Sequence, residues 1–198
     1  FCDHQSRDRS SGFAQNSLNG ALLRLAADEN IIVAESMAHY YKGERTFRLS
    51  AGQQQEVRKW MLTGLGGGIA PWFHFVGGGT QDKRKFSISR DLYRFVGENK
   101  KWFRNRTNTA NVGVVWNQES AIYYGRDRAE ERSAASSKGM TESLSRAGIP
   151  FLPIHADDIG KYGERMQLLI LPNLALLSER PEAAVRERFK EGKALLLT

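Results

Sequence analysis

The sequence is poor in the residues that mark several common classes of protein. Its 198 residues include a single cysteine, Cys2, which excludes an internal disulfide and a zinc site built on several cysteines. The four histidines do not pair at metal-ligand spacing, so we expect no metal and no other cofactor. No apolar run approaches the roughly 18–20 residues that a membrane span needs, so we expect no membrane partner.

Two motifs that carry phosphate or acyl chemistry are also missing. The glycine-rich stretches 64–68 and 77–79 are not followed by the lysine of a P-loop, and the first lies between a helix and a strand, the reverse of the order in a dinucleotide-binding loop. No Gly-x-Ser-x-Gly nucleophile elbow occurs. The chain opens at Phe1 rather than Met, so any leader peptide would lie upstream, and the sequence leaves the localisation open between cytoplasm and export.

The distribution of charge is the first uneven feature. Hydrophobic residues make up 40% and charged residues 26% of the chain, as in ordinary globular proteins, but the formal net charge of +7 lies entirely in residues 1–110. It is concentrated at 83–85 and 90–106, and such a basic segment can attract phosphates. We favour a solvated helix face, because the apolar residues of this segment already have a packing role, and we expect no nucleic acid partner.

The first half of the chain alternates strand and helix patterns. A short apolar run at 31–34 predicts a buried strand that ends in Glu35. Val57, Trp60, Met61 and Leu65 recur at helical spacing and predict a helix over 53–65, while 69–76 reads as a second strand. A further helix, capped by Ser87 or Ser89, is predicted to run to about Phe103. This alternation predicts an α/β fold with a parallel sheet.

The second half repeats the alternation after a polar stretch at 104–110, where we expect a boundary between a domain of residues 1–105 and a domain of residues 108–198. The predicted elements are a strand at 111–116, a loop around 123–125, a helix at 128–147 closed by Gly148, strands at 149–154 and 167–171, a helix from Ser178 to 190 and a strand at 194–197. Pro150 and Pro153 predict that the second of these strands lies at a sheet edge.

Glu35 is the residue that points most directly to chemistry. A carboxylate at the end of a parallel strand lies where barrel enzymes place their catalytic groups. Candidate ligand-contacting side chains follow nearby or occur at other strand ends: Tyr40, Trp72, His74, Asp82, Asp3 and His4. Carboxylates among aromatic rings and imidazoles are typical of a sugar pocket, so we expect a carbohydrate partner. The alternative is that Glu35 forms an ion pair, for example with Arg45 or Arg48, and that Trp72 and His74 belong to the core.

Several stretches together resemble a known enzyme family. Residues 31–41 (IIVAESMAHYY) and 64–86 (GLGGGIAPWFHFVGGGTQDKRKF) resemble the last turns of the barrel in family forty-two type beta-galactosidases and their uncharacterised relatives. Residues 111–124 (NVGVVWNQESAIYY), 147–154 (AGIPFLPI) and 168–178 (LLILPNLALLS) resemble the domain that follows, the beta-galactosidase trimerisation domain. The resemblance implies the tail of a (β/α)8 barrel, and then a flavodoxin-like domain similar to class I glutamine amidotransferases.

The resemblance also implies functional roles. Glu35 matches the nucleophile position at the end of the seventh barrel strand, and Trp72 and His74 would line the sugar subsite. A retaining mechanism needs a second carboxylate about 5–5.5 Å away as acid and base. In the family this residue comes from the fourth strand, which lies outside this sequence, so the isolated chain is expected to be an inactive part of a glycoside hydrolase. The second domain is expected to assemble a homo-oligomer, a trimer by resemblance.

Two other classes of function stay open at this point. One is a carbohydrate-binding or oligomerisation module that retains the fold and lacks catalysis. The other is a nucleic-acid-binding module that uses the basic residues of 83–106, for which affinity would fall steeply with salt.

Overall fold

A computed structural model describes residues 12–27, 34–38, 53–74 and 83–198, with the backbone alone for 34–38, His74 and Lys85. The chain divides into two compact units, residues 1–107 and residues 108–198, here called unit 1 and unit 2. The division falls inside the polar stretch 104–110. None of the described helices is both long and apolar enough to cross a membrane.

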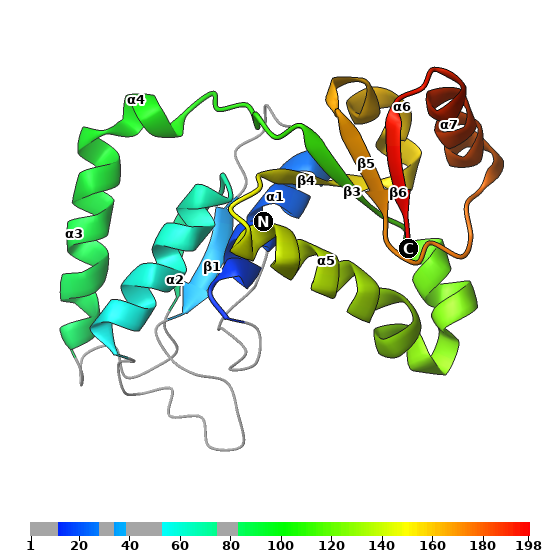
Figure 1. The fold of residues 1–198 in the computed structure, drawn as a ribbon. Helices are drawn as coiled ribbons and strands as arrows, with labels where there is room; N and C mark the ends of the chain where they lie inside the picture. Colours follow the sequence, from blue (N-terminus) through cyan, green and yellow to red (C-terminus); the bar gives the residue numbers. More distant parts are fainter. Residues whose placement is uncertain (1–11, 28–33, 39–52, 75–82) are drawn as a thin grey trace. The chain divides into compact units, whose positions relative to one another are not determined.

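Unit 1 alternates helices and strands (Figure 1). Its described elements are α1 (Ala14–Ala26), β1 (Ala34–Ala38), α2 (Gln54–Gly66), β2 (Ala70–His74), α3 (Arg84–Glu98) and α4 (Lys100–Phe103). The strands β1 and β2 pair in parallel, which confirms the prediction of a parallel sheet. The helix predicted over 53–65 is confirmed to within one residue at each end.

The core of unit 1 forms between α2 and α3. Its buried members are the predicted residues of α2 and apolar residues from the following turn and α3 (Val57, Trp60, Met61, Leu65, Ile69, Ile88 and Leu92). Met61 is fully buried, and Trp60 is only 2% exposed. The helical spacing of these residues therefore predicted the packed face of α2 correctly.

The helix α1 was not among the predicted elements. Leu18, Leu22 and Leu25 follow the i, i+4, i+7 pattern of one helix face, and Leu25 is buried. The buried Asn16 side chain donates a hydrogen bond from Nδ2 to the Trp60 carbonyl oxygen at 2.8 Å. A polar residue on the packed face weakens the apolar pattern of this helix, and its partner lies 44 residues away.

The glycine run between α2 and β2 serves backbone packing and a turn. A Cβ atom on Gly67 would collide with the backbone carbonyl of Ser17 in α1, and one on Gly20 would lie 3.1 Å from the backbone of Gly67. Gly68 has φ +92°, a conformation that residues with a Cβ rarely adopt. The close contact of α1 with α2 explains the glycine at position 67, and the positive φ explains the glycine at position 68.

The start of α3 differs from the prediction. The helix begins at Arg84 rather than after Ser87 or Ser89, so both serines lie inside it. Their hydroxyls donate to the carbonyl oxygens three residues earlier, Ser87 to Arg84 at 2.7 Å and Ser89 to Phe86 at 3.3 Å. A serine hydroxyl can bond in this way within a helix as well as cap its start, and the sequence alone does not distinguish the two.

Unit 2 contains a four-stranded parallel sheet in the order β4-β3-β5-β6. The strands are β3 (Val112–Trp116), β4 (Phe151–His155), β5 (Leu168–Leu171) and β6 (Ala194–Leu197). The helical elements are η1 (Ser120–Gly125), η2 (Arg126–Arg128), η3 (Glu130–Ala134), α5 (Ala135–Arg146), η4 (Ala156–Asp158), α6 (Ile159–Tyr162), η5 (Gly163–Arg165) and α7 (Glu179–Lys190). The predicted edge position of the proline-containing strand, β4, is confirmed.

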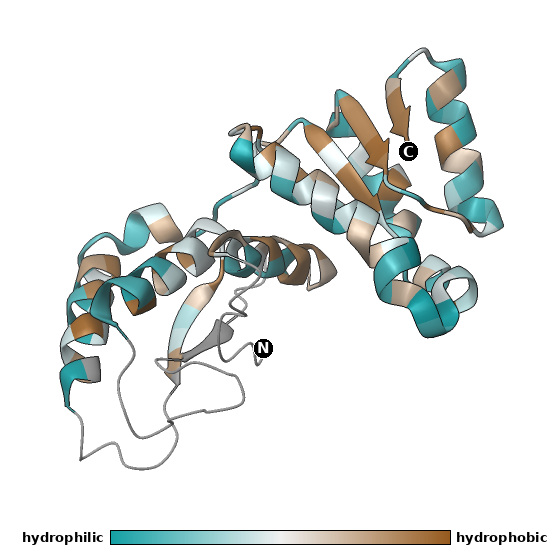
Figure 2. Cartoon of the chain, turned by 60° about the horizontal axis from the view of Figure 1, so that its bottom comes forward, coloured by the Kyte–Doolittle hydropathy of each residue, from teal (hydrophilic) through white to brown (hydrophobic). Residues whose placement is uncertain are grey.

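Helices cover both faces of this sheet. Leu144 of α5 packs with Val114 and Ile170 on one face. Leu169 alternates with Ile170 along β5, and on the opposite face its side chain lies 3.6 Å from the Cβ position of Gly163 in η5. Val114 of β3 and Leu169 and Ile170 of β5 are all at most 2% exposed. Figure 2 shows the strands as the most hydrophobic part of unit 2. The chain therefore belongs to the α/β class.

The connection from β3 to α5 also differs from the prediction. Residues 120–125 form a π-helical turn where a loop was expected. The helix predicted at 128–147 is present, but its first part, η3, is π-helical, and the α-helix α5 begins at Ala135. The Asn117 side chain starts this turn, because its Oδ1 accepts a hydrogen bond from the Glu119 N–H at 2.9 Å.

Candidate functional site

The parallel pairing of β1 and β2 brings the predicted site strands side by side. Glu35 lies opposite Pro71 in the register, Ser36 opposite Trp72, and Ala38 opposite His74. Glu35 and Trp72 are therefore one residue apart in register on neighbouring strands, which in a sheet are about 4.8 Å apart. The residues Asp3, His4, Tyr40 and Asp82 lie outside the described part of the chain.

The register also distributes these positions between two faces. Successive strand residues alternate, so the position of Glu35 belongs with Pro71 and Phe73, whereas Trp72 and His74 belong with Ser36 and Ala38. Phe73 packs against the helical core of unit 1. Glu35 and Trp72 are thus neighbours along the sheet, but their positions belong to opposite faces. The strand β1 continues for three residues beyond Glu35, so the prediction that this strand ends at Glu35 is wrong, and the catalytic role of Glu35 stays a prediction.

Trp72 is partly accessible to a ligand. The side chain is 44% exposed, whereas its neighbour Phe73 packs against the core. This exposure is too high for a core residue, so the alternative that Trp72 belongs to the core is not supported. An exposed indole offers a flat apolar face and one N–H donor, which are the features that suit stacking on a sugar ring.

Tyr93 of α3 binds the backbone of β2 on the edge that does not pair with β1. The sequence analysis did not identify this residue. Its hydroxyl donates to the Pro71 carbonyl oxygen at 2.9 Å and accepts from the Phe73 N–H at 2.8 Å. The N–H and C=O groups of one strand residue face the same edge of the strand. The Pro71 carbonyl therefore faces Tyr93 rather than β1, and Pro71 has no N–H that would need a partner on this edge. Burial raises the pKa of Tyr93, and the hydrogen bond from Phe73 partly opposes this rise.

A small polar pocket lies between the N-terminal halves of α2 and α3. Its volume is about 150 Å³, and it is lined by Gln54, Gln55, Arg58, Ser87, Ile88 and Asp91. Amide, hydroxyl, guanidinium and carboxylate groups are suited to hydrogen bonding with a hydroxyl-rich ligand. Within the described ranges, no group of three or more histidine, cysteine or acidic residues could hold a metal ion.

In unit 2, the usual ligand position of a parallel sheet is occupied by the chain itself. Ligands bind such sheets beyond the carboxyl ends of the strands, where the strand order reverses, which here is between β3 and β5. At this place the Leu176 carbonyl oxygen accepts from Asn117 Nδ2 at 2.8 Å, and the Leu176 N–H donates to Ser120 Oγ at 2.9 Å. Unit 2 therefore uses these residues to hold its own loop.

Comparison with known proteins identifies a fold likeness and no family. No family model matches the chain, and no curated protein matches it. The chain is similar in structure to the alpha-L-fucosidase isoenzyme 2 from Paenibacillus thiaminolyticus, with a TM-score of 0.66 and 16% sequence identity. The match covers 99% of this chain and 29% of that protein, so the chain spans less than a third of the length of the structure it matches. At this identity the likeness concerns the fold.

Proposed function

We propose that this chain is part of a glycoside hydrolase-like protein. The observation that carries the proposal is the likeness, over 99% of the chain, to the fold of an alpha-L-fucosidase. Unit 1 would be the end of a (β/α)8 barrel and unit 2 a flavodoxin-like, amidotransferase-like domain. The strand, helix, strand, helix order of β1, α2, β2 and α3 and the parallel pairing of β1 with β2 support the barrel assignment.

The proposed reaction is hydrolysis of a glycosidic bond by two carboxylates. Glu35 would act as the nucleophile, and Trp72 and His74 would contact the sugar. The acid and base carboxylate would come from a strand outside the 198 residues, so the chain alone would lack one essential role. The sugar is a β-galactoside if the sequence resemblance governs and an α-L-fucoside if the structural likeness does.

The test is hydrolysis of aryl glycosides by the longer protein that contains this chain. Aryl β-D-galactosides and aryl α-L-fucosides are assayed with the wild type, with Glu35→Gln, and with Glu98→Gln as a matched surface control. The proposal predicts turnover by the wild type and the control, and at least about 1,000-fold less turnover for Glu35→Gln. Turnover within about three-fold of wild type for Glu35→Gln would rule out the nucleophile assignment.

A second candidate is a carbohydrate-binding module without catalysis. The observation that favours it is the register, which assigns the positions of Glu35 and Trp72 to opposite faces of the sheet. This candidate predicts sugar binding that is lost in Trp72→Ala and unchanged in Glu35→Gln, with no turnover by any variant. The hydrolase proposal predicts loss of turnover in both variants.

Unit 2 would serve assembly into a homo-oligomer, a trimer by the sequence resemblance. The hydrogen bonds of the Leu176 backbone with Asn117 and Ser120 support a structural rather than a ligand-binding role for this part of the sheet. Sedimentation equilibrium of the longer protein tests this: a mass of three chains is expected, and a monomer at all concentrations would exclude it.

A further inference from the structure

The charge of the chain is concentrated on one segment of unit 1. Residues 83–106 contain nine lysines and arginines and two acidic residues, a net +7 that equals the net charge of the entire chain. Seven of the described basic side chains are exposed, and six of them are here called the basic face: Lys83, Arg90, Arg94, Lys100, Lys101 and Arg104. The other 174 residues carry no net charge, so this segment alone makes the protein basic.

Among the described residues, the basic face has one carboxylate partner. Arg90 lies 3.4 Å from Asp91, both largely exposed, and within the described residues no ion pair joins the other five to an acidic side chain. Protein surfaces normally intersperse charges of both signs, because like charges close together repel one another. A strongly one-signed face attracts ligands of opposite charge, so a solvated helix surface is an incomplete account of it.

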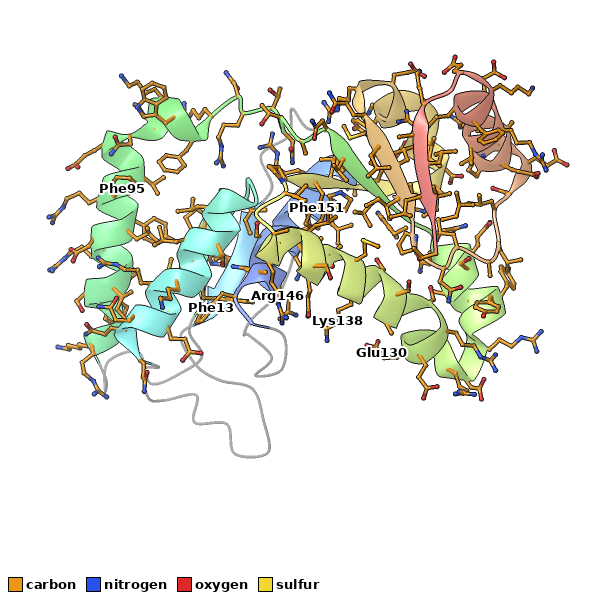
Figure 3. The ribbon with its side chains drawn as sticks, in the orientation of Figure 1. Phe13, Phe95, Glu130, Lys138, Arg146 and Phe151 are labelled. Carbon is orange, nitrogen blue, oxygen red and sulfur yellow. The ribbon has the colours of Figure 1, made fainter. Side chains whose placement is uncertain are left out.

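Exposed aromatic rings lie among these cations. Trp102 is 67% exposed and Phe95 is 49% exposed. The Lys101 ammonium lies 4.9 Å from the centre of the Trp102 ring, and Phe95 contacts Phe103 edge to face at 5.9 Å. Figure 3 shows the Phe95 side chain on α3. An aromatic face beside an ammonium group can stack on a ring while the cation pairs with an acidic substituent of that ring.

We infer that the basic face binds an acidic polysaccharide, a glycan chain that bears carboxylate or sulfate groups. The inference rests on the proposed function for the sugar part of this ligand. From Lys83 to Arg94 the helix rises about 16 Å, which is longer than one sugar ring and suits an extended polymer rather than a single small anion. Single-stranded nucleic acids stack successive bases on several rings. Of the aromatic rings described on α3 and α4, Trp102 alone is more than half exposed.

The binding assay uses matched polymers and the intact 198-residue chain. Dextran sulfate and polygalacturonate supply sulfate and carboxylate groups, and unmodified dextran supplies the same backbone as the first without charge. Affinity electrophoresis or calorimetry is expected to show binding to both acidic polymers and none to dextran. The affinity is expected to fall at least about ten-fold when salt rises from about 0.05 to 0.3 M, because exposed charges are screened.

Two quadruple variants distinguish binding by the basic face from a general effect of the net charge. The first changes Arg94, Lys100, Lys101 and Arg104 to Gln, and the matched control changes Lys138, Arg146, Arg180 and Lys190 of unit 2 to Gln. All eight side chains are exposed, so each variant removes four charges with little effect on folding. We expect about ten-fold or greater loss of affinity for the first and less than about two-fold for the second. Trp102→Ala, at unchanged charge, is expected to lose about three-fold or more.

Three results would overturn the inference: equal losses in the two quadruple variants, no binding at low salt, or at least about ten-fold tighter binding of single-stranded DNA than of dextran sulfate. The last would assign the face to nucleic acid. None of these results affects the hydrolysis assay with Glu35→Gln, so the two proposals fail separately. Turnover of neutral glycosides without binding to acidic polymers would refute this inference alone.

Discussion

Replacing Tyr93 by Phe removes a single hydroxyl that makes two hydrogen bonds to the backbone of β2. The Pro71 carbonyl loses its donor at 2.9 Å, and the Phe73 N–H loses its acceptor at 2.8 Å. A typical hydrogen bond contributes about 0.5–1.5 kcal/mol to stability. Tyr93 is 39% exposed, so water replaces part of what is lost. We therefore expect a decrease of about 1–2 kcal/mol in the free energy of unfolding of unit 1.

Urea unfolding followed by tryptophan fluorescence measures this effect, because Trp60, Trp72 and Trp102 all lie in unit 1. The matched control is Tyr123→Phe, whose side chain is 65% exposed in unit 2 and whose change should alter stability by less than about 0.5 kcal/mol. Equal stability of Tyr93→Phe and the control would refute the role of this hydroxyl in holding β2. A second readout is faster amide exchange of Phe73 in the variant.

Three further predictions concern pH, close packing and a buried arginine. Burial raises the pKa of Tyr93 in the folded protein, so its contribution is complete below pH 10 and is lost as the pH rises through the folded pKa; the wild type should lose stability above pH 10 more steeply than Tyr93→Phe in pH-jump unfolding. Gly67→Ala should lower the melting temperature, because its Cβ would collide with the Ser17 backbone, whereas Gly66→Ala, with nothing within 4 Å, should not; equal melting of the two would contradict the contact. Arg188 is 4% exposed and donates to the carbonyl oxygens of Gly163, Met166 and Ala194. Arg188→Met should therefore lower the free energy of unfolding by about 2–4 kcal/mol in denaturant titrations, and the exposed Arg186→Met by less than about 0.5 kcal/mol. A small effect at Arg188 would mean that water satisfies these carbonyls.

The features predicted correctly from the sequence depend on local periodicity. Val57, Trp60, Met61 and Leu65 recur at helical spacing, and the structure buries all four. Proline has no N–H for a sheet ladder, which predicted the edge position of β4 from Pro150 and Pro153. The α/β class followed from the alternation of such segments, since each pattern reports one element and its packed face.

The features that were missed depend on partners far along the chain. Asn16 is polar, and its place on the packed face of α1 becomes understandable only with its bond to the Trp60 carbonyl. The partners of Tyr93 are backbone atoms about 20 residues earlier, for which a sequence carries no signal. The positions of Glu35 and Trp72 each fit a strand, but a shift of one residue in pairing reverses every face, so their relation required the register.

The most direct test of the proposed function is to trap the nucleophile of the longer protein with an activated 2-fluoro aryl glycoside. Its leaving group departs without protonation, so only the nucleophile is needed to form the covalent sugar ester. Trypsin cleaves after Arg24 and Lys42, which places Glu35 in the peptide 25–42. The proposal predicts one added sugar on that peptide, located at Glu35 by fragmentation and absent from Glu35→Gln. A sugar attached to any other residue of a catalytically competent sample would contradict it.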